Sequence, residues 1–170
     1  MADTFTLISS ATVGAGGATD ITFSSIPSTY TDLCLKVSAR SDSTPGAVWN
    51  ALRVNFNGNS ANLSNRALYG DGSSTSSGSG TLGEFGFADS SNATSSTFGN
   101  SEMYIPNYAG SSNKSYSGDG LSETNATSSL IALEAGLWSN TAAITTIKIF
   151  LQTGNFAQYS TAYLYGVKNA

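Results

Sequence analysis

The fold is decided by one stretch near the end of the chain, residues 144–168, which reads ITTIKIFLQTGNFAQYSTAYLYGVK. Successive side chains of an extended backbone point to opposite faces, so Ile147, Ile149 and Leu151 share one face of a predicted strand. A second alternating run follows a Gly-containing break, and this combination predicts an antiparallel hairpin. The first run is apolar on both faces, which predicts a central position for these last strands.

The same alternation recurs through the rest of the chain, and no helical period of useful length appears. Pro27 and Pro106 end two of the runs, and Asn57-Gly58 predicts a tight hairpin turn after a third. About eight to ten short strands separated by turn signals are typical of an antiparallel sandwich or barrel. We therefore predict an all-β fold, a jelly-roll-like antiparallel β-sandwich that forms a single domain over residues 1–170. The predicted strands before the final stretch are 5–13, 19–26, 32–40, 49–56, 62–69, 82–88, 97–108 and 129–138.

Two polar segments interrupt this pattern. Residues 70–81 are rich in Ser and Gly, and we predict an exposed loop there because they bury too little to offset their ordering entropy. The long stretch 109–128 is predicted to be either a functional loop or partly ordered as a hairpin. Between them, residues 82–88 should place Phe85 and Phe87 on one face.

Composition excludes several classes of partner. Charged residues are 11% of the chain, against about 25% in typical domains, and the net charge is -4. The few basic residues are scattered, so we expect no nucleic-acid binding. No stretch is apolar enough for membrane insertion, and the first residues lack the features of a signal peptide. The single cysteine, Cys34, lies in an alternating run and is predicted to be structural.

Catalytic and metal-binding motifs are not found in the sequence. Histidine is absent, which excludes imidazole-based catalysis and imidazole metal ligands. Asp71, Asn113 and Asp119 lie in Gly-rich segments, where turn formation explains them better than Ca²⁺ binding. We therefore expect no enzyme activity, no catalytic residue, no metal and no cofactor. A pair of carboxylates could still serve glycoside hydrolysis, with candidates Asp71, Glu84, Asp89, Glu102, Asp119, Glu123 and Glu134.

Aromatic residues in or beside predicted loops are the remaining candidates for an interaction site. Aromatic side chains can stack on sugar faces or anchor a protein interface. The candidates are Trp49, Tyr69, Tyr104, Tyr108, Tyr116 and Trp138.

The C-terminal residues 163–169, YLYGVKN, resemble the Tyr-Leu-Tyr-Gly-Ile-Lys-Asn ending of structural proteins from tailed bacteriophages, especially cyanophages. Other segments that resemble this family are 5–10, 26–33, 52–58 and 104–108. The resemblance spans most of the chain, and Val167 stands where Ile is commoner. It implies a β-sandwich virion component, either a capsid decoration (cement) protein or a domain of a tail or head fibre, commonly assembled as a homotrimer.

From this resemblance we expect a virion protein that is assembled in the host cytoplasm. Capsid decoration is the first expectation, with the major capsid protein and further copies of the chain as partners, because one domain begins almost directly with a strand. The alternative is a fibre module that recognises host cell-surface glycan through loop aromatics. A glycan depolymerase comes third.

Overall fold

A computed structural model describes residues 4–125 and 128–168, and all regular structure within them is β-strand. The final residue of the YLYGVKN segment, Asn169, lies outside these described residues. The strands are β1 (Phe5–Thr12), β2 (Asp20–Phe23), β3 (Asp32–Ala39), β4 (Trp49–Phe56), β5 (Leu63–Gly70), β6 (Thr75–Gly80), β7 (Glu84–Asp89), β8 (Gly99–Ile105), β9 (Lys114–Ser122), β10 (Leu130–Trp138), β11 (Ile147–Leu151) and β12 (Thr161–Val167).

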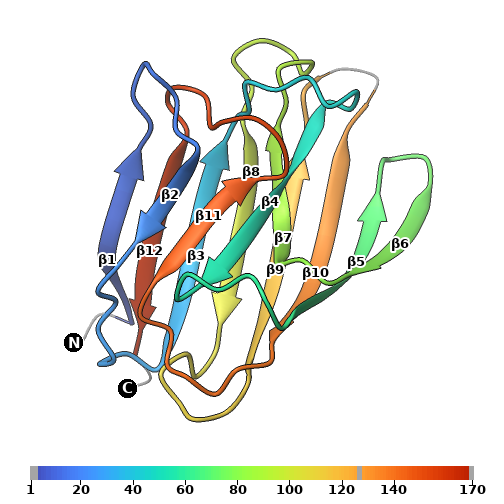
Figure 1. The fold of residues 1–170 in the computed structure, drawn as a ribbon. Helices are drawn as coiled ribbons and strands as arrows, with labels where there is room; N and C mark the ends of the chain where they lie inside the picture. Colours follow the sequence, from blue (N-terminus) through green and yellow to red (C-terminus); the bar gives the residue numbers. More distant parts are fainter. Residues whose placement is uncertain (1–3, 126–127, 169–170) are drawn as a thin grey trace.

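The strands form two antiparallel sheets packed face to face (Figure 1). The larger sheet has eight strands in the order β1-β12-β3-β8-β9-β10-β5-β6, and the smaller has four in the order β2-β11-β4-β7. The run β1-β12-β3-β8 facing β2-β11-β4-β7 is the strand order of a jelly roll, which confirms the predicted fold class. The hairpins β5–β6 and β9–β10 are additions that extend the larger sheet beyond the edge of the smaller one.

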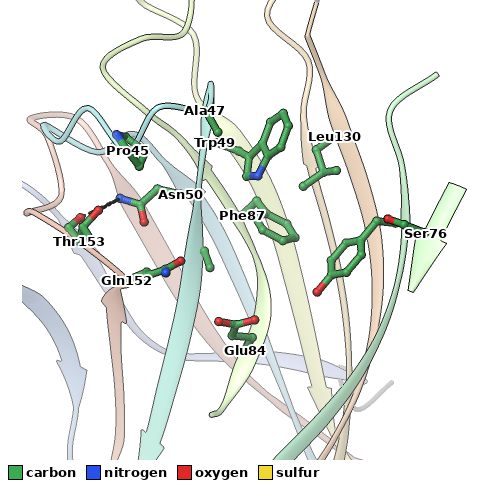
Figure 2. Close-up of a pocket in the computed structure, with 12 residues that line it drawn as sticks. Pro45, Ala47, Trp49, Asn50, Ser76, Glu84, Phe87, Leu130, Gln152 and Thr153 are labelled. Atoms are coloured by element: carbon green, nitrogen blue, oxygen red, sulfur yellow. Dashed lines mark hydrogen bonds between the residues drawn. The ribbon is translucent and has the colours of Figure 1, made fainter. Parts of the chain in front are cut away.

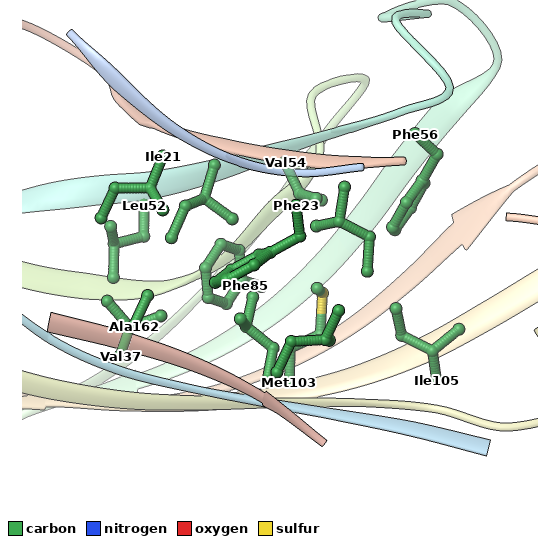
Figure 3. Close-up of a cluster of buried hydrophobic side chains, with 14 of the residues drawn as sticks. Ile21, Phe23, Val37, Leu52, Val54, Phe56, Phe85, Met103, Ile105 and Ala162 are labelled. Carbon is green, nitrogen blue, oxygen red and sulfur yellow. The ribbon is translucent and has the colours of Figure 1, made fainter. Parts of the chain in front are cut away.

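The core lies between the two sheets and is built by the predicted alternation. Leu33 and Leu35 from β3 and Leu52 and Val54 from β4 are fully buried. Figure 3 shows side chains from both sheets interdigitating in this layer. Burying each such side chain contributes about 1.5–3 kcal/mol, so this layer dominates the stability of the fold.

The predicted C-terminal hairpin is wrong. Strand β11 pairs with β2 and β4 in the smaller sheet, whereas β12 pairs with β1 and β3 in the larger sheet. The connection crosses the core edge, where Phe156 is fully buried and its backbone exchanges hydrogen bonds with Ala18. The alternating pattern requires only that each strand turns its apolar face toward the core. Two strands in opposite sheets of a sandwich meet this requirement as well as two strands paired in a hairpin. Their predicted central positions are confirmed.

The Asn57-Gly58 turn forms, with positive φ angles of 53° and 72°. It does not close a hairpin, because the next strand, β5, belongs to the larger sheet, where it pairs with β10 and β6. The Asn57 side chain instead binds the segment before β11, accepting hydrogen bonds from the backbone N–H groups of Thr145 (2.8 Å) and Thr146 (3.1 Å).

Both polar segments contain strands. The predicted loop at 70–81 includes β6, which pairs with β5 along its length. Backbone hydrogen bonds hold this hairpin, so it needs no buried side chains of its own, and this is why composition misled the prediction. The carboxylate of Asp71 closes the turn by accepting hydrogen bonds from the N–H groups of Ser73 (2.9 Å) and Ser74 (2.7 Å). In the segment 109–128, of which 126–127 lie outside the described residues, the hairpin alternative is confirmed by the pairing of β9 with β10.

Candidate functional site

The larger sheet extends past β7, the edge strand of the smaller sheet (Figure 1). A cleft opens there, and Figure 2 shows the residues that line it. One wall is the β5–β6 hairpin, which we call the flap, and the opposite wall is the outer side of β4 and β7. The cleft has a volume of about 500 Å³. A second hollow of about 340 Å³ shares Tyr69 and Glu84 with it and continues beneath the flap. Concave sites of this size suit small ligands or single sugar units.

Aromatic rings line the middle of the cleft. Trp49 and Tyr69 are half-buried, while Phe87 is nearly covered between them. The rings of Tyr69 and Phe87 meet edge to face, with centroids 6.1 Å apart. Gly78 on β6 makes room for Tyr69, because a Cβ atom there would lie 3.1 Å from the tyrosine ring. The flap and the smaller sheet therefore present aromatic surface to one space.

A β-bulge in β7 places two of the cleft residues. Arg53 of β4 pairs with Glu84, but the next residue, Leu52, pairs with Gly86, so Phe85 is an extra residue in the ladder. Phe85 therefore points into the main core, and Phe87 points into the cleft. The expectation that both phenylalanines share a face is wrong for this reason.

One end of the cleft carries a neutralised ion pair. The guanidinium of Arg53 donates two hydrogen bonds to Oε1 of Glu84, from Nε at 3.1 Å and from Nη2 at 2.9 Å. Both bonds end on the same oxygen, which leaves Oε2 to accept a hydrogen bond from a ligand. Both side chains are about four-fifths buried, so the pair is rigid and adds no net charge to the cleft.

Amides lie at the other end. Asn50 is buried and its Nδ2 donates to the Ser41 hydroxyl (2.9 Å) and the Thr153 carbonyl (2.7 Å), which fixes the amide plane. Its Oδ1 has no hydrogen-bond partner within the part of the chain that the structure describes. Gln152, next along the chain from β11, is exposed beside it (Figure 2). The Asn50 amide is buried, so the exposed amide of Gln152 is the group that offers a donor and an acceptor to a ligand at this end.

A buried carboxyl lies near the second hollow. Glu134 of β10 is 4% exposed, and its Oε2 accepts a hydrogen bond from Nδ2 of Asn65 at 3.2 Å. Burial raises the pKa of Glu134 to about 7, and the negative charge of Glu84 adds to the rise. Asn65 lines the hollow, whereas the Glu134 carboxyl is enclosed by protein. Glu134 therefore affects the site mainly through its charge state.

The structure brings together two of the predicted interaction residues, Trp49 and Tyr69, in the cleft. Tyr104 lies half-buried on the opposite side of the larger sheet, where its hydroxyl donates to Asp32 at 2.6 Å, a bond that raises the pKa of Tyr104 to about 12. It takes no part in the cleft. Asn50 and the aromatic Phe87 were not predicted, because only the bulge and the flap bring them beside Trp49. Glu84 was named only as a candidate carboxylate for glycoside hydrolysis.

The other three residues predicted for interaction are buried in the core. Tyr108, Tyr116 and Trp138 are each at most 3% exposed. Tyr116 and Trp138 lie on strands and point inward, where both pack against Phe56 with ring centroids 6.0 and 5.5 Å away. The Tyr108 hydroxyl donates to the carbonyl of Pro27. None of the three presents a ring face to a ligand.

Neither a scan against protein-family models nor a search of curated proteins gave a match for this chain. Among the described residues, no three His, Cys, Asp or Glu side chains gather in a way that could hold a metal ion. Residues 4–125 and 128–168 also contain no helix long and apolar enough to cross a membrane.

Proposed function

We propose that this chain is a non-enzymatic glycan-binding module and that the cleft between the flap and the smaller sheet is its binding site. The observation that carries the proposal is the meeting of Trp49, Tyr69 and Phe87 in one open cleft with polar groups at both ends. Sugar rings have an apolar C–H face that packs on aromatic rings, and their hydroxyls need donors and acceptors at the rim. The cleft supplies both.

The charges favour a neutral sugar. Arg53 is committed to Glu84, so it offers no free cation to the carboxylate or sulfate of an acidic glycan. The remaining polar groups of the rim, Gln152, Ser76 and the free oxygen of Glu84, suit hydroxyl groups. Above pH 7, the ionised carboxyl of Glu134 would also repel an anionic sugar. We therefore propose a neutral hexose or a similar residue as the unit recognised.

The arrangement of carboxyls supports binding without hydrolysis. Glycoside hydrolysis needs two carboxyl groups that flank the scissile bond, one of them a protonated acid. Glu134 has the raised pKa of such an acid, but its carboxyl is enclosed. Glu84 is held by Arg53. A sugar bound in the open cleft would contact the carboxyl group of Glu84 but not that of Glu134.

A glycan array followed by titration calorimetry tests the proposal. Trp49→Ala should weaken the binding of a neutral glycan about tenfold or more, since stacking on one aromatic ring is worth about 1–2 kcal/mol. Tyr159→Ala is the matched control, because Tyr159 is the most exposed large aromatic among the described residues and lies outside the cleft. Absence of binding to any neutral glycan, or equal affinities for the two variants, would contradict the proposal.

Capsid decoration is the second proposed function, with the major capsid protein as the partner and the virion as the location. The observation that favours it is the jelly-roll strand order, since this architecture also builds viral capsid subunits. The strand order supports decoration by analogy of fold, and the sequence resemblance at residues 163–169 adds to it. Purified chain should bind phage heads that lack it and raise their resistance to heat. Heads that bind none of it would count against decoration, and antibody label on the tail alone would favour the glycan-binding role.

A further inference from the structure

The exposed hydrophobic side chains gather on one surface of the described chain. Nine large hydrophobic side chains of the described residues are at least 38% exposed, and seven of them lie on β1, β5, β9, β10 and β12 of the larger sheet. Within residues 4–125 and 128–168, no second layer covers the outer face of this sheet, the face that points away from the core (Figure 1). The seven side chains are Phe5, Leu7, Leu68, Leu121, Ile131, Leu133 and Tyr163.

Strand register shows that they share the outer face and form two clusters. Leu133 pairs directly with Leu68, and Ile131 pairs with Leu121, so these residues form a contiguous patch that we call the β10 cluster. An apolar hollow of about 270 Å³ lies among its members. At the other side of the sheet, the β1 cluster contains Phe5, Leu7 and Tyr163, which stand on the neighbouring strands β1 and β12.

Charged side chains occupy the middle of the face between the clusters. Lys36 of β3 forms an ion pair with Glu102 of β8, and Glu102 lies opposite Asp119 of β9. Arg66 on β5 supplies a second cation, so the exposed cations and carboxylates of this face balance, although the whole chain carries a net charge of -4. Asp32, also on β3, is buried and already accepts hydrogen bonds. A second copy could approach this face without net repulsion.

We infer that the outer face is a contact between two copies of this chain, related by a two-fold axis that lies in the plane of the contact, passes near Lys36 of β3 and Glu102 of β8, and is inclined to the strands. This axis exchanges the two sides of the sheet. The β1 cluster of each copy then covers the β10 cluster of the other, and the central charges meet with Lys36 of one copy near the carboxylates of the second. Such an isologous contact closes on itself and limits the assembly to a dimer.

The size of the face matches what a stable dimer needs. Strands spaced about 4.8 Å apart make the sheet about 38 Å wide, and about seven residues per strand make it about 23 Å long. The resulting area, roughly 900 Å², is close to the about 800 Å² that each partner buries in a standard interface.

Sedimentation velocity tests the inference. The wild-type chain should sediment as a dimer that dissociates on dilution, and the double substitution Ile131→Thr with Leu133→Thr should yield a monomer. Both positions are at least 58% exposed and threonine favours strands, so the fold should survive, as circular dichroism and thermal unfolding will show. Leu82→Thr is the matched control, because Leu82 is 45% exposed but lies outside the outer face.

Several results would overturn this inference. A wild-type monomer at high concentration, a trimer, or a dimer that survives the double substitution would each exclude the two-fold contact. A wild-type monomer that binds phage heads only when Ile131 and Leu133 are intact would assign the face to the capsid. The cleft faces away from this surface, so a monomeric double variant should still bind glycan in the cleft with wild-type intrinsic affinity.

Discussion

The ring of Tyr69 on the flap meets the ring of Phe87 on β7 edge to face, with centroids 6.1 Å apart and an interplanar angle of 70°. This contact joins the larger sheet to the exposed edge of the smaller one. Strand β5 of the flap is already paired with β10 along its length, and the ring contact adds a side-chain tie between β5 and the smaller sheet. The aromatic pair therefore contributes to the width of the cleft.

Removal of that pair should loosen the flap. Tyr69→Ala is expected to lower the free energy of unfolding by about 1–3 kcal/mol, since it removes a half-buried ring and an aromatic contact. Amide hydrogen exchange measured by mass spectrometry should accelerate in β5 and β6 while β3 remains protected. Tyr69→Phe keeps the ring and should behave as wild type. Unchanged exchange in the flap of Tyr69→Ala would show that the contact does not hold it.

The ring of Tyr116 packs so closely on the backbone of Gly136 that only glycine fits at this position. A Cβ atom at position 136 would lie 1.9 Å from the tyrosine Cζ, well inside contact distance, and both residues lie in central strands. Gly136→Ala should therefore destabilise the fold by about 1–3 kcal/mol or more in urea unfolding. Gly14→Ala, where the added Cβ meets nothing within 4 Å, is the control and should be nearly neutral. Equal stability of the two variants would refute this packing argument.

The stability of the fold should fall as pH rises through the neutral range, because of Glu134. Burial raises the pKa of its carboxyl from an ordinary 4.5 to about 7. Between these values the folded chain keeps a proton that the unfolded chain releases, so stability is greatest below about pH 4.5, decreases up to about pH 7 and is then level with respect to this group.

Substitution of Glu134 by glutamine tests this dependence. Glu134→Gln imitates the neutral acid and should remove a decrease on the order of 1–3 kcal/mol between about pH 5 and pH 8. Chemical unfolding of both proteins at the two pH values measures the difference. Glu123→Gln, at an exposed carboxylate, should keep the wild-type slope. If wild type and Glu134→Gln have the same slope, Glu134 does not carry the effect.

Cys34 should be inert in the folded chain. Its side chain is 1% exposed, and burial raises the pKa of the thiol to about 11. Because only the thiolate reacts rapidly, a thiol reagent at pH 8 should modify native protein only as fast as the protein unfolds. Addition of denaturant should release one reactive thiol per chain. Rapid modification without denaturant would contradict the buried position of β3.

The sequence alone determines that this chain is an antiparallel sandwich of short strands. Alternation at residues 32–40 and 147–151 is a local property, and it states which side chains of a strand face the core. The absence of histidine and the low charge are equally direct statements about chemistry. The turn at Asn57-Gly58 was also predictable, because these residue types adopt positive φ readily.

Only the tertiary structure decides which sheet each strand joins and which side chains meet in the cleft. A strand with one apolar face can satisfy it in either sheet, so β11 and β12 separate although the sequence reads as a hairpin. The bulge at Phe85 arises from pairing with β4, and it turns Phe87 toward Trp49. Tyr116 and Trp138 are buried because of the partners opposite them. Pairing between distant segments depends on the summed burial of the whole core, which no local pattern contains.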